Sequence, residues 1–213
     1  MINTKTFYFN DLRVCTYILW DDTKECIIVD AGCESASEQN RLQKFITENN
    51  LRPVMLINTH AHFDHVLGNL FVSETYSIPS AIHEDDMLLL SKVSQQTAMF
   101  GLEVKQPPMA TVFLTEKEPV RFGNSQLQVL HTPGHTLGGI CLYSAEDKFV
   151  LVGDTLFNES IGRTDLPGGN YDDLMNSIRT KLMTLPDETV VFSGHGAAST
   201  IGYEKLNNPY IAN

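Results

Sequence analysis

Short apolar runs alternate with polar turns at the start of the chain. Residues 14–20 (VCTYILW) and 25–32 (ECIIVDAG) are apolar, and the four residues between them, DDTK, are typical of a turn. This pattern predicts a β-hairpin. A helix is predicted next, capped by Ser35 or Ser37, with apolar positions at helical spacing within 42–46 and an end at the asparagines 49–50. The apolar run 53–60 (PVMLINTH) then predicts a strand buried on both faces, whose carboxyl end delivers a histidine.

The second half of the chain repeats one plan, in which an apolar strand runs into a turn rich in glycine or proline. The predicted strands are 126–134, 138–144, 148–154 and 188–196, and a helix with a 3.6-residue apolar period is predicted at 171–185. Strand-rich halves with interleaved helices favour an α/β (α+β) fold, namely an αββα sandwich of two mixed sheets with helices on the outer faces, although the pattern leaves another mixed α/β fold open. Length and the lack of a linker predict a single domain over residues 1–213.

Composition narrows the partners. The formal net charge of -11 disfavours nucleic acid and anionic membrane surfaces as partners. No apolar run approaches the ~20 residues of a membrane span, and the first ten residues lack the pattern of a secretory signal. The four cysteines contain no CxxC pair and are expected to be reduced thiols. The cytoplasm is therefore the expected compartment, and oligomeric state is not predicted.

Three of the seven histidines fall within six residues, in the sequence THAHFDH. His60, His62, Asp64 and His65 offer imidazole nitrogen and carboxylate oxygen, which suit divalent ions; zinc is the first expectation, and iron and manganese fit the same ligands. Closely spaced ligands on a tight turn can serve two adjacent ions.

Further candidate ligands lie at the turns that end three predicted strands. His135 in TPGHT and His195 in SGHG are flanked by glycine or proline, which lets the backbone approach a site closely. Asp154 ends a buried strand, where a neighbouring cation would offset the cost of its charge. His83 and His131 lack such a context and are interpreted as ordinary surface or core histidines.

The order THAHFDH, TPGHT, GDT and GHG resembles the metallo-β-lactamase superfamily of hydrolases. The stretches 157–170 (FNESIGRTDLPGGN) and 194–211 resemble its short glyoxalase II-like branch, which hydrolyses thioesters such as hydroxyacylglutathione. The resemblance implies that one metal is held by His60, His62 and His135. A second metal would be held by Asp64, His65 and His195, and Asp154 would bridge the two.

The implied mechanism is attack on a thioester carbonyl by a hydroxide shared between the two ions, whose pKa they lower towards 7. Asp64 would orient this nucleophile and carry a proton. True β-lactamases usually lack the histidine at the place of His65 and often have cysteine at that of Asp154, so β-lactam hydrolysis is disfavoured.

Two segments are open to both a functional and a structural interpretation. Arg163 and Asp165 could bind an anionic substrate, or Arg163 could pair with an acidic neighbour while Asp165 caps a turn. Residues 91–114 could form a substrate-facing flap or could simply pack over the core.

Alternative functions also remain. Longer glyoxalase II enzymes add a carboxyl-terminal region that supplies basic groups for glutathione, and the chain ends soon after its GHG motif, so another thiol or ester is open. The persulfide dioxygenases, which share the fold and use one iron, are the alternative from another reaction class. A lactonase or nuclease of the same superfamily, or a non-catalytic binding module, completes the set.

Overall fold

The computed structural model of the chain describes residues 1–99, 101 and 103–212. These residues form two compact units, the first comprising 1–113 with 121–125 and the second comprising 114–120 with 126–213. The described chain forms two six-stranded sheets, and each sheet contains parallel and antiparallel pairs. The predicted two mixed sheets with helices are confirmed.

The first sheet has the strand order β1-β2-β3-β4-β5-β6. Its strands are β1 (Asn3–Phe9), β2 (Val14–Trp20), β3 (Glu25–Val29), β4 (Arg52–Ile57), β5 (Ser80–Ile82) and β6 (Val112–Phe113). The predicted hairpin is β2–β3, and β3, β4, β5 and β6 are parallel to one another. The strand β1 was not predicted, because its alternating lysine and threonines leave only its last part buried. The prediction for 53–60 was wrong in part: only Leu56 and Ile57 of β4 are fully buried.

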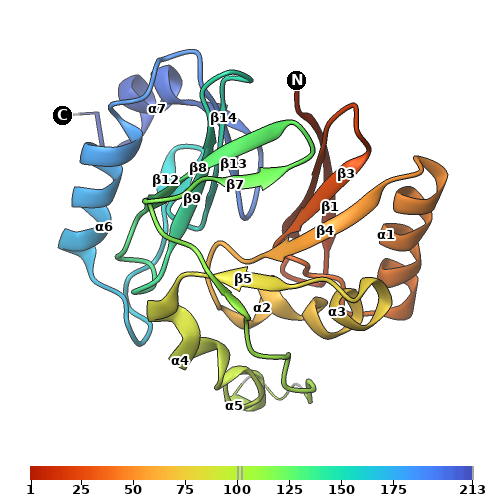
Figure 1. Cartoon of the computed structure of the whole chain (residues 1–213). Coiled ribbons are helices and arrows are strands. Elements are labelled where there is room, and N and C mark those ends of the chain that lie inside the picture. The colour runs from red at the N-terminus through yellow and green to blue at the C-terminus, as the bar shows by residue number, and fades with distance from the viewer. Residues whose placement is uncertain (100, 102, 213) are drawn as a thin grey trace. The chain divides into compact units, whose positions relative to one another are not determined.

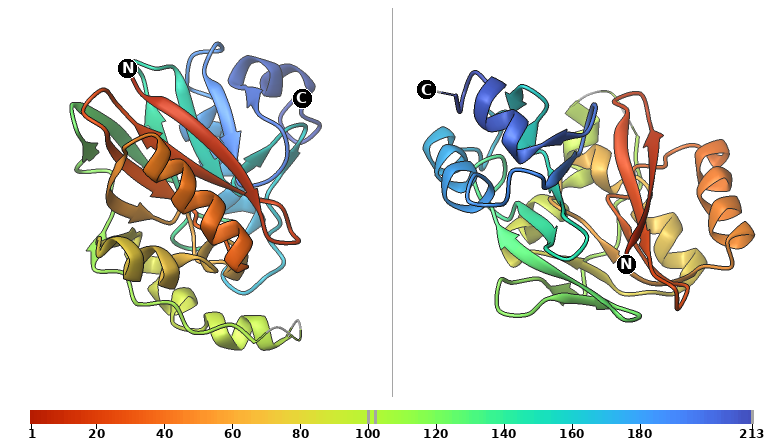
Figure 2. Two further views of the ribbon diagram at one scale, coloured as in Figure 1. Left: turned by 90° about the vertical axis from the view of Figure 1, so that its right-hand side faces the viewer. Right: turned by 90° about the horizontal axis from the view of Figure 1, so that it is seen from above.

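Several helices pack beside the first sheet. They are α1 (Ala36–Glu48), α2 (Phe63–Val66), α3 (Asn69–Tyr76), a 3-10 turn η1 (Glu84–Asp86), α4 (Met87–Leu90) and α5 (Val93–Met99). Helices α1 and α3 pack on the sheet through an apolar cluster that includes Leu42, Ile46 and Val72, and Figures 1 and 2 show α1 lying along one face. Ser35 is the residue that caps α1, in a capping box with Glu38, as one of the two predicted alternatives.

The segment 91–114 packs in part over the core of the first unit. Val93 and Ala110 join Ala61 and Val66 in a buried apolar cluster. Phe100, one of the apolar residues of this segment, lies outside the described residues. Packing against Ala61 within THAHFDH and against Val66 just after it is thus established for part of the segment, and its role as a flap stays a hypothesis.

The second sheet has the order β14-β13-β10-β9-β8-β7. Its strands are β7 (Val120–Phe122), β8 (Ser125–His131), β9 (Ile140–Ser144), β10 (Phe149–Gly153), β13 (Val190–Ser193) and β14 (Ser199–Thr200), and a separate hairpin is formed by β11 (Leu156–Phe157) and β12 (Ser160–Ile161). The four predicted strands of this half are β8, β9, β10 and β13. Strands β10 and β13 are parallel, so their carboxyl ends lie at the same edge of the sheet.

Helix α6 (Tyr171–Ser177) continues into a π-helical turn, η2 (Ile178–Leu182), and α7 (Ile201–Asn207) follows β14. The predicted helix at 171–185 is therefore present but ends at Leu182, ahead of Pro186. Leu174, Ile178 and Leu182 are fully buried against the second sheet, which accounts for their helical spacing. Figure 1 shows α6 and α7 beside the strands of this sheet. All four cysteines of the chain are buried and unpaired in disulfides.

Candidate metal centre

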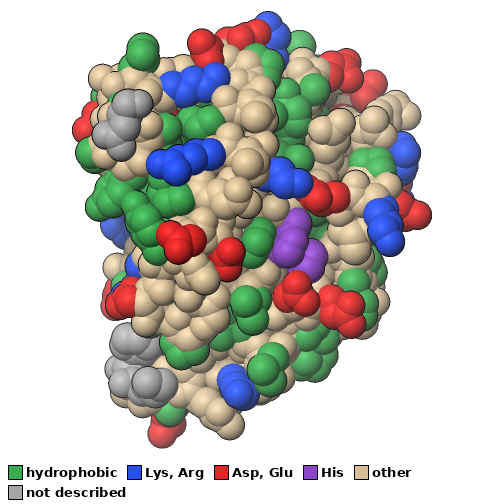
Figure 3. Space-filling view, turned by 90° about the vertical axis from the view of Figure 1, so that its left-hand side faces the viewer, with side chains coloured by type: hydrophobic (Ala, Val, Ile, Leu, Met, Phe, Trp, Pro, Cys, Tyr) green, Lys and Arg blue, Asp and Glu red, His purple; other side chains and the backbone are tan. Residues whose placement is uncertain are grey.

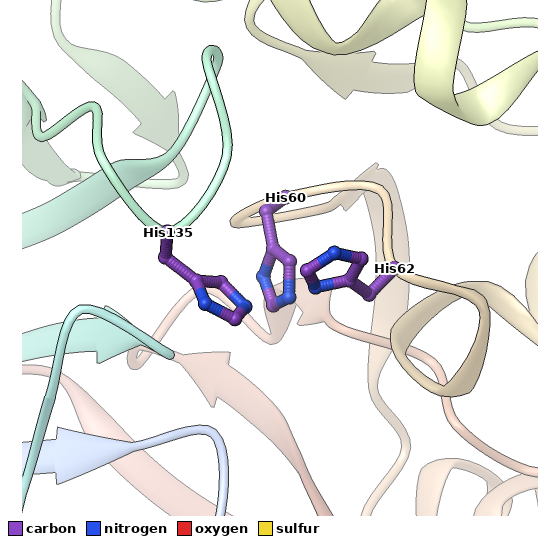
Figure 4. A group of neighbouring side chains, drawn as sticks. All are labelled: His60, His62 and His135. Carbon is purple, nitrogen blue, oxygen red and sulfur yellow. The ribbon is translucent and has the colours of Figure 1, made fainter. Parts of the chain in front are cut away.

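The THAHFDH motif forms the first donor cluster, defined as His60, His62, Asp64 and His65. All four side chains are buried. His60 and His62 lie in the loop after β4, and Asp64 and His65 lie in the short helix α2. The ring centroids of His60 and His62 lie 4.9 Å apart with the rings edge to face, and the ring centroids of His60 and His65 lie 4.1 Å apart. Figure 4 shows the side chains of His60 and His62 next to each other. The loop therefore concentrates its imidazoles at one place.

Asparagine side chains fix the backbone of this cluster. Asn58, just after β4, donates from Nδ2 to the His65 carbonyl at 3.1 Å and accepts from Asn69 at 2.7 Å. Asn10 donates to the Asp64 carbonyl at 3.1 Å. Amide side chains therefore add to the short helix α2 in holding the backbone of the motif.

Asp30 follows β3 and sets the proton positions of two histidines. Its Oδ1 accepts from the Thr59 amide at 2.7 Å, and its Oδ2 accepts from the Thr59 hydroxyl at 2.6 Å and lies 3.0 Å from His65 Nδ1. Since a carboxylate only accepts, His65 carries its proton on Nδ1. The Thr59 hydroxyl gives its own proton to Asp30, so its oxygen accepts from His60 Nδ1 at 3.1 Å. Both rings therefore present the Nε2 lone pair as the ligand atom.

The second donor cluster consists of His135, Asp154 and His195. Asp154 follows β10 and His195 lies two residues after β13, so the parallel pair brings both to one sheet edge. Gly153, with φ of +50°, creates a register shift at the end of β10, and its carbonyl accepts from the Gly194 amide at 2.7 Å. The Asp154 Oδ2 lies 3.6 Å from His195 Nε2 and 3.6 Å from His135 Nε2. One carboxylate oxygen thus lies close to a ring nitrogen of both histidines.

His135, drawn with His60 and His62 in Figure 4, is also fixed through Nδ1. Its Nδ1 donates to the Arg163 carbonyl at 2.8 Å, so Nε2 again holds the lone pair. Gly134 precedes it with φ of +131°, and a Cβ there would lie 2.1 Å from the Leu174 nitrogen. Gly162 would place a Cβ 1.9 Å from the Asp154 carbonyl oxygen. Only glycine fits at these two approaches.

The geometry of each cluster fits a divalent ion. Two ligands at 2.0–2.2 Å from a tetrahedral ion lie about 3.3–3.6 Å apart. The two 3.6 Å distances at Asp154 match this separation, and Asp64 Oδ2 lies 3.7 Å from His65 Nε2. The donors are imidazoles with a defined ligand nitrogen together with carboxylates, which is the set that zinc, iron and manganese accept.

The remaining candidates have other contacts. Arg163 and Asp165 form a bidentate pair at 2.7 Å for both hydrogen bonds, on the exposed side of their loop. The hydrogen bond from Arg163 lowers the pKa of Asp165 to about 2, and the same bond raises the pKa of Arg163. His83 accepts from the Asp85 amide, and His131 Nε2 lies 3.0 Å from the Leu137 carbonyl.

The residues that orient the donors were not predicted from the sequence. Asp30 ends the strand segment ECIIVD just as Asp154 ends KFVLVGD, and this shared position at a strand end was the available signal. Asp86 was also missed: it is buried and its Oδ2 accepts from the Ala61 amide, between two histidines of the motif, at 2.9 Å. Nothing in its own segment, HEDDMLLL, singles it out from Asp85.

Comparison with known proteins identifies the family. The model of the metallo-beta-lactamase superfamily matches residues 10–195, a range that includes both donor clusters. The chain belongs to this superfamily. Its members are metal-dependent hydrolases, which establishes the broad class of the chain and confirms the resemblance seen in its motifs.

Two relatives cover nearly the whole chain. The hydroxyacylglutathione hydrolase GloC of Haemophilus influenzae is 36% identical over 91% of this chain and 91% of its own length. The probable metallo-hydrolase YqgX of Bacillus subtilis is 36% identical over 92% of this chain and 90% of its own length.

Solved structures share the fold throughout. BLEG-1, a B3 metallo-beta-lactamase, matches with a TM-score of 0.90 and 33% identity over all of both chains. TTHA1623 in a di-iron-bound form matches with a TM-score of 0.87 and 32% identity, over 97% of this chain and 99% of that one. ETHE1 from Myxococcus xanthus matches with a TM-score of 0.82 and 26% identity, over 99% of this chain and 84% of that one. The chain therefore has the metallo-β-lactamase fold.

Proposed function

We propose that the chain is a binuclear metal-dependent hydrolase of small thioesters. One ion is assigned to His60, His62 and His135, and the other to Asp64, His65 and His195, with Asp154 shared between the two. The two units then act as one functional domain over residues 1–213, in keeping with a family match that includes both. Zinc is the first expectation for both ions.

The observation that carries this proposal is the state of three imidazoles. The Nδ1 atoms of His60, His65 and His135 are each bound to an acceptor of the protein, namely the Thr59 hydroxyl, the Asp30 carboxylate and the Arg163 carbonyl. This arrangement fixes the ring orientation and leaves Nε2 as the ligand atom of each. Three buried histidines that are oriented in this way close to carboxylates are better explained by metal binding than by packing alone.

When bound, two such ions lower the pKa of a water molecule towards 7 and act as Lewis acids on the carbonyl oxygen of the substrate. The residues of the chain supply the rest. Asp64 orients the attacking nucleophile and holds the proton that the reaction releases. Its backbone is fixed by Asn10, so the carboxylate keeps one position during the reaction.

Thioesters are the proposed substrate class for two reasons. The relative GloC carries the name hydroxyacylglutathione hydrolase and covers nearly all of this chain. A thiolate leaves readily because the pKa of a thiol is about 8.5, so the reaction does not require a general acid to protonate the leaving group. Glutathione itself is not assigned as the thiol.

The surface is consistent with a small-molecule substrate. The net charge is -11, and Figure 3 shows acidic and basic side chains interspersed on one face. In the described part of the chain, no helix combines the length and apolar character that crossing a membrane requires. We propose the cytoplasm as the compartment and neither nucleic acid nor membrane as a partner.

Metal content per chain, measured together with turnover of a substrate panel, tests the proposal. The panel contains hydroxyacyl thioesters of several thiols, lactones, a β-lactam and a persulfide, with oxygen uptake followed in parallel. Two ions per chain and preference for thioesters are expected. One iron per chain with oxygen consumption would instead establish a persulfide oxygenase, and a preference for the lactone or the β-lactam would refute the substrate class alone.

A further inference from the structure

The C-terminal helix α7 carries a buried carboxylate that the proposed reaction does not use. Glu204 is fully buried and accepts hydrogen bonds from four groups. Its Oε1 accepts from the Ser199 hydroxyl and from Asn158 Nδ2 at 3.3 Å, and its Oε2 accepts from the Glu159 amide at 3.0 Å and from Asn208 Nδ2 at 2.8 Å. Two of these donors belong to the turn of the β11–β12 hairpin.

The β11–β12 hairpin needs such an anchor. Each of its strands has two residues, and a ribbon of this size is not stable by itself in water. Its turn also contains Glu159 at φ of +58°, a left-handed conformation that is unfavourable for a residue with a side chain. The carboxylate of Glu204 binds the amide of that residue, and Asn208 Nδ2 donates to the Ser160 carbonyl at 3.0 Å. Helix α7 therefore holds the hairpin in its turn geometry.

The residues that directly follow the hairpin hydrogen-bond a proposed metal ligand. Gly162 and Arg163 follow β12 without an intervening residue, and the Arg163 carbonyl accepts from His135 Nδ1 at 2.8 Å. The same loop is tied at its other end, where the Asn170 amide donates to the Gly134 carbonyl at 2.8 Å. The position of the carbonyl that orients His135 thus depends on where the hairpin is held.

We propose that Glu204 is a positioning residue for His135, acting through the β11–β12 hairpin and the Arg163 carbonyl to keep the ring with Nε2 as its ligand atom. The proposal rests on the ligand role of His135 in the proposed function, and it does not depend on which substrate is cleaved. It assigns a role to the STIGYEKLNN segment, which includes no metal-donor residue.

The test compares Glu204→Gln with Glu188→Gln in the full-length protein. Glutamine has one accepting oxygen and one donating NH2 group. The NH2 group would therefore face two of the four groups that donate to the carboxylate of Glu204. Glu188 makes an exposed pair with Lys148 in the same unit and provides the control. Zn²⁺ alone is the probe, titrated against a chromophoric chelator. We expect Glu204→Gln to weaken Zn²⁺ binding by about 3- to 10-fold, at or below the lower end of the range for partners that touch a ligand directly, and Glu188→Gln to leave it unchanged.

Two further measurements on the metal-free protein separate positioning from general stability. In Glu204→Gln, the Glu159 amide should exchange its hydrogen faster, and the ring nitrogens of His135 should show a mixture of Nδ1 and Nε2 protonation by NMR. If Glu204→Gln fails to fold, Asn158→Ala removes one exposed donor to the same carboxylate and should produce the same changes at about twofold in Zn²⁺ affinity. A lower melting temperature with an unchanged His135 ring and unchanged Zn²⁺ affinity, in either variant, would overturn the proposal. Inactivity towards thioesters would refute the substrate class and leave these results unaffected.

Discussion

Replacing Asp30 by asparagine tests whether Asp30 orients the ring of His65 in the first donor cluster. The carboxylate accepts from the Thr59 amide, the Thr59 hydroxyl and His65 Nδ1. Asparagine keeps the shape but turns one oxygen into a donor. If the new NH2 group faces His65 Nδ1, that nitrogen must become an acceptor, and the proton moves to Nε2, where it blocks ligation.

The opposite orientation of the amide is no better. The NH2 group would then face the Thr59 amide, which places two buried donors against each other. Either outcome costs about 1–3 kcal/mol. When this cost must be overcome as the ion binds, it corresponds to about 5- to 150-fold weaker metal affinity. The expected effect on the ion that His65 holds therefore spans one to two orders of magnitude.

Asp21→Asn is the matched control. Asp21 is also a buried aspartate of the first unit, and it accepts from Thr23, Asn124 and Ser125 at a turn that includes no metal-donor residue. Both variants should lose stability, which thermal unfolding measures. Only Asp30→Asn should also lose Zn²⁺ affinity by competition titration and move the proton of His65 to Nε2 by NMR of the metal-free protein. Equal Zn²⁺ affinities in the two variants would refute the assignment of Asp30 as the residue that orients His65.

Three other predictions address the second donor cluster and the Arg163–Asp165 pair. Asp154→Ala should abolish binuclear metal binding and nearly all hydrolysis, whereas His83→Ala should leave both intact; metal analysis and thioester turnover check this, and full activity with a single bound ion would contradict it. Gly162→Ala should lower both the melting temperature and Zn²⁺ affinity, the latter about tenfold, because the new Cβ would lie 1.9 Å from the Asp154 carbonyl oxygen and 3.2 Å from His135 Nδ1. Wild-type affinity would show that the loop yields without cost. Arg163→Ala should raise KM for an anionic thioester far more than for a neutral one if Arg163 leaves Asp165 to bind substrate, and equal effects on both would assign the pair to loop structure.

Much of the fold was predictable because local pattern and tertiary burial agree. The β2–β3 hairpin, the cap of α1 and the strands β8, β9, β10 and β13 follow from apolar runs and turn residues. Strand β1 was not predicted because an edge strand with alternating lysine and threonine shows little apolar pattern. The widening of the helix after Ser177 into a π-helical turn escaped because it keeps Ile178 and Leu182 buried, so the apolar pattern stays the same.

The candidate donors were predictable for a different reason from their supporting residues. Donors concentrate at turns after strands, and three histidines within six residues stand out against any background. Their partners include backbone atoms, such as the Arg163 carbonyl, which every residue possesses and no sequence pattern marks. Asn10 and Glu204 form hydrogen bonds with residues far away in the sequence, at Asp64 and Glu159, so these roles exist only once the chain has folded.

Asp30 and Asp154 show where sequence inference ends. Each follows a strand that is parallel to its neighbour, and in each unit that neighbour leads to a histidine, His60 after β4 and His195 after β13. The intervening residues decide the difference. Thr59 places an amide and a hydroxyl on the Asp30 carboxylate, whereas Gly194 has no side chain and its amide is used by the Gly153 carbonyl. Asp30 is thereby committed to orienting rings, and Asp154 Oδ2 lies at ligand separation from two Nε2 atoms. The residue before the histidine, threonine or glycine, therefore accounts for the different contacts of the two aspartates.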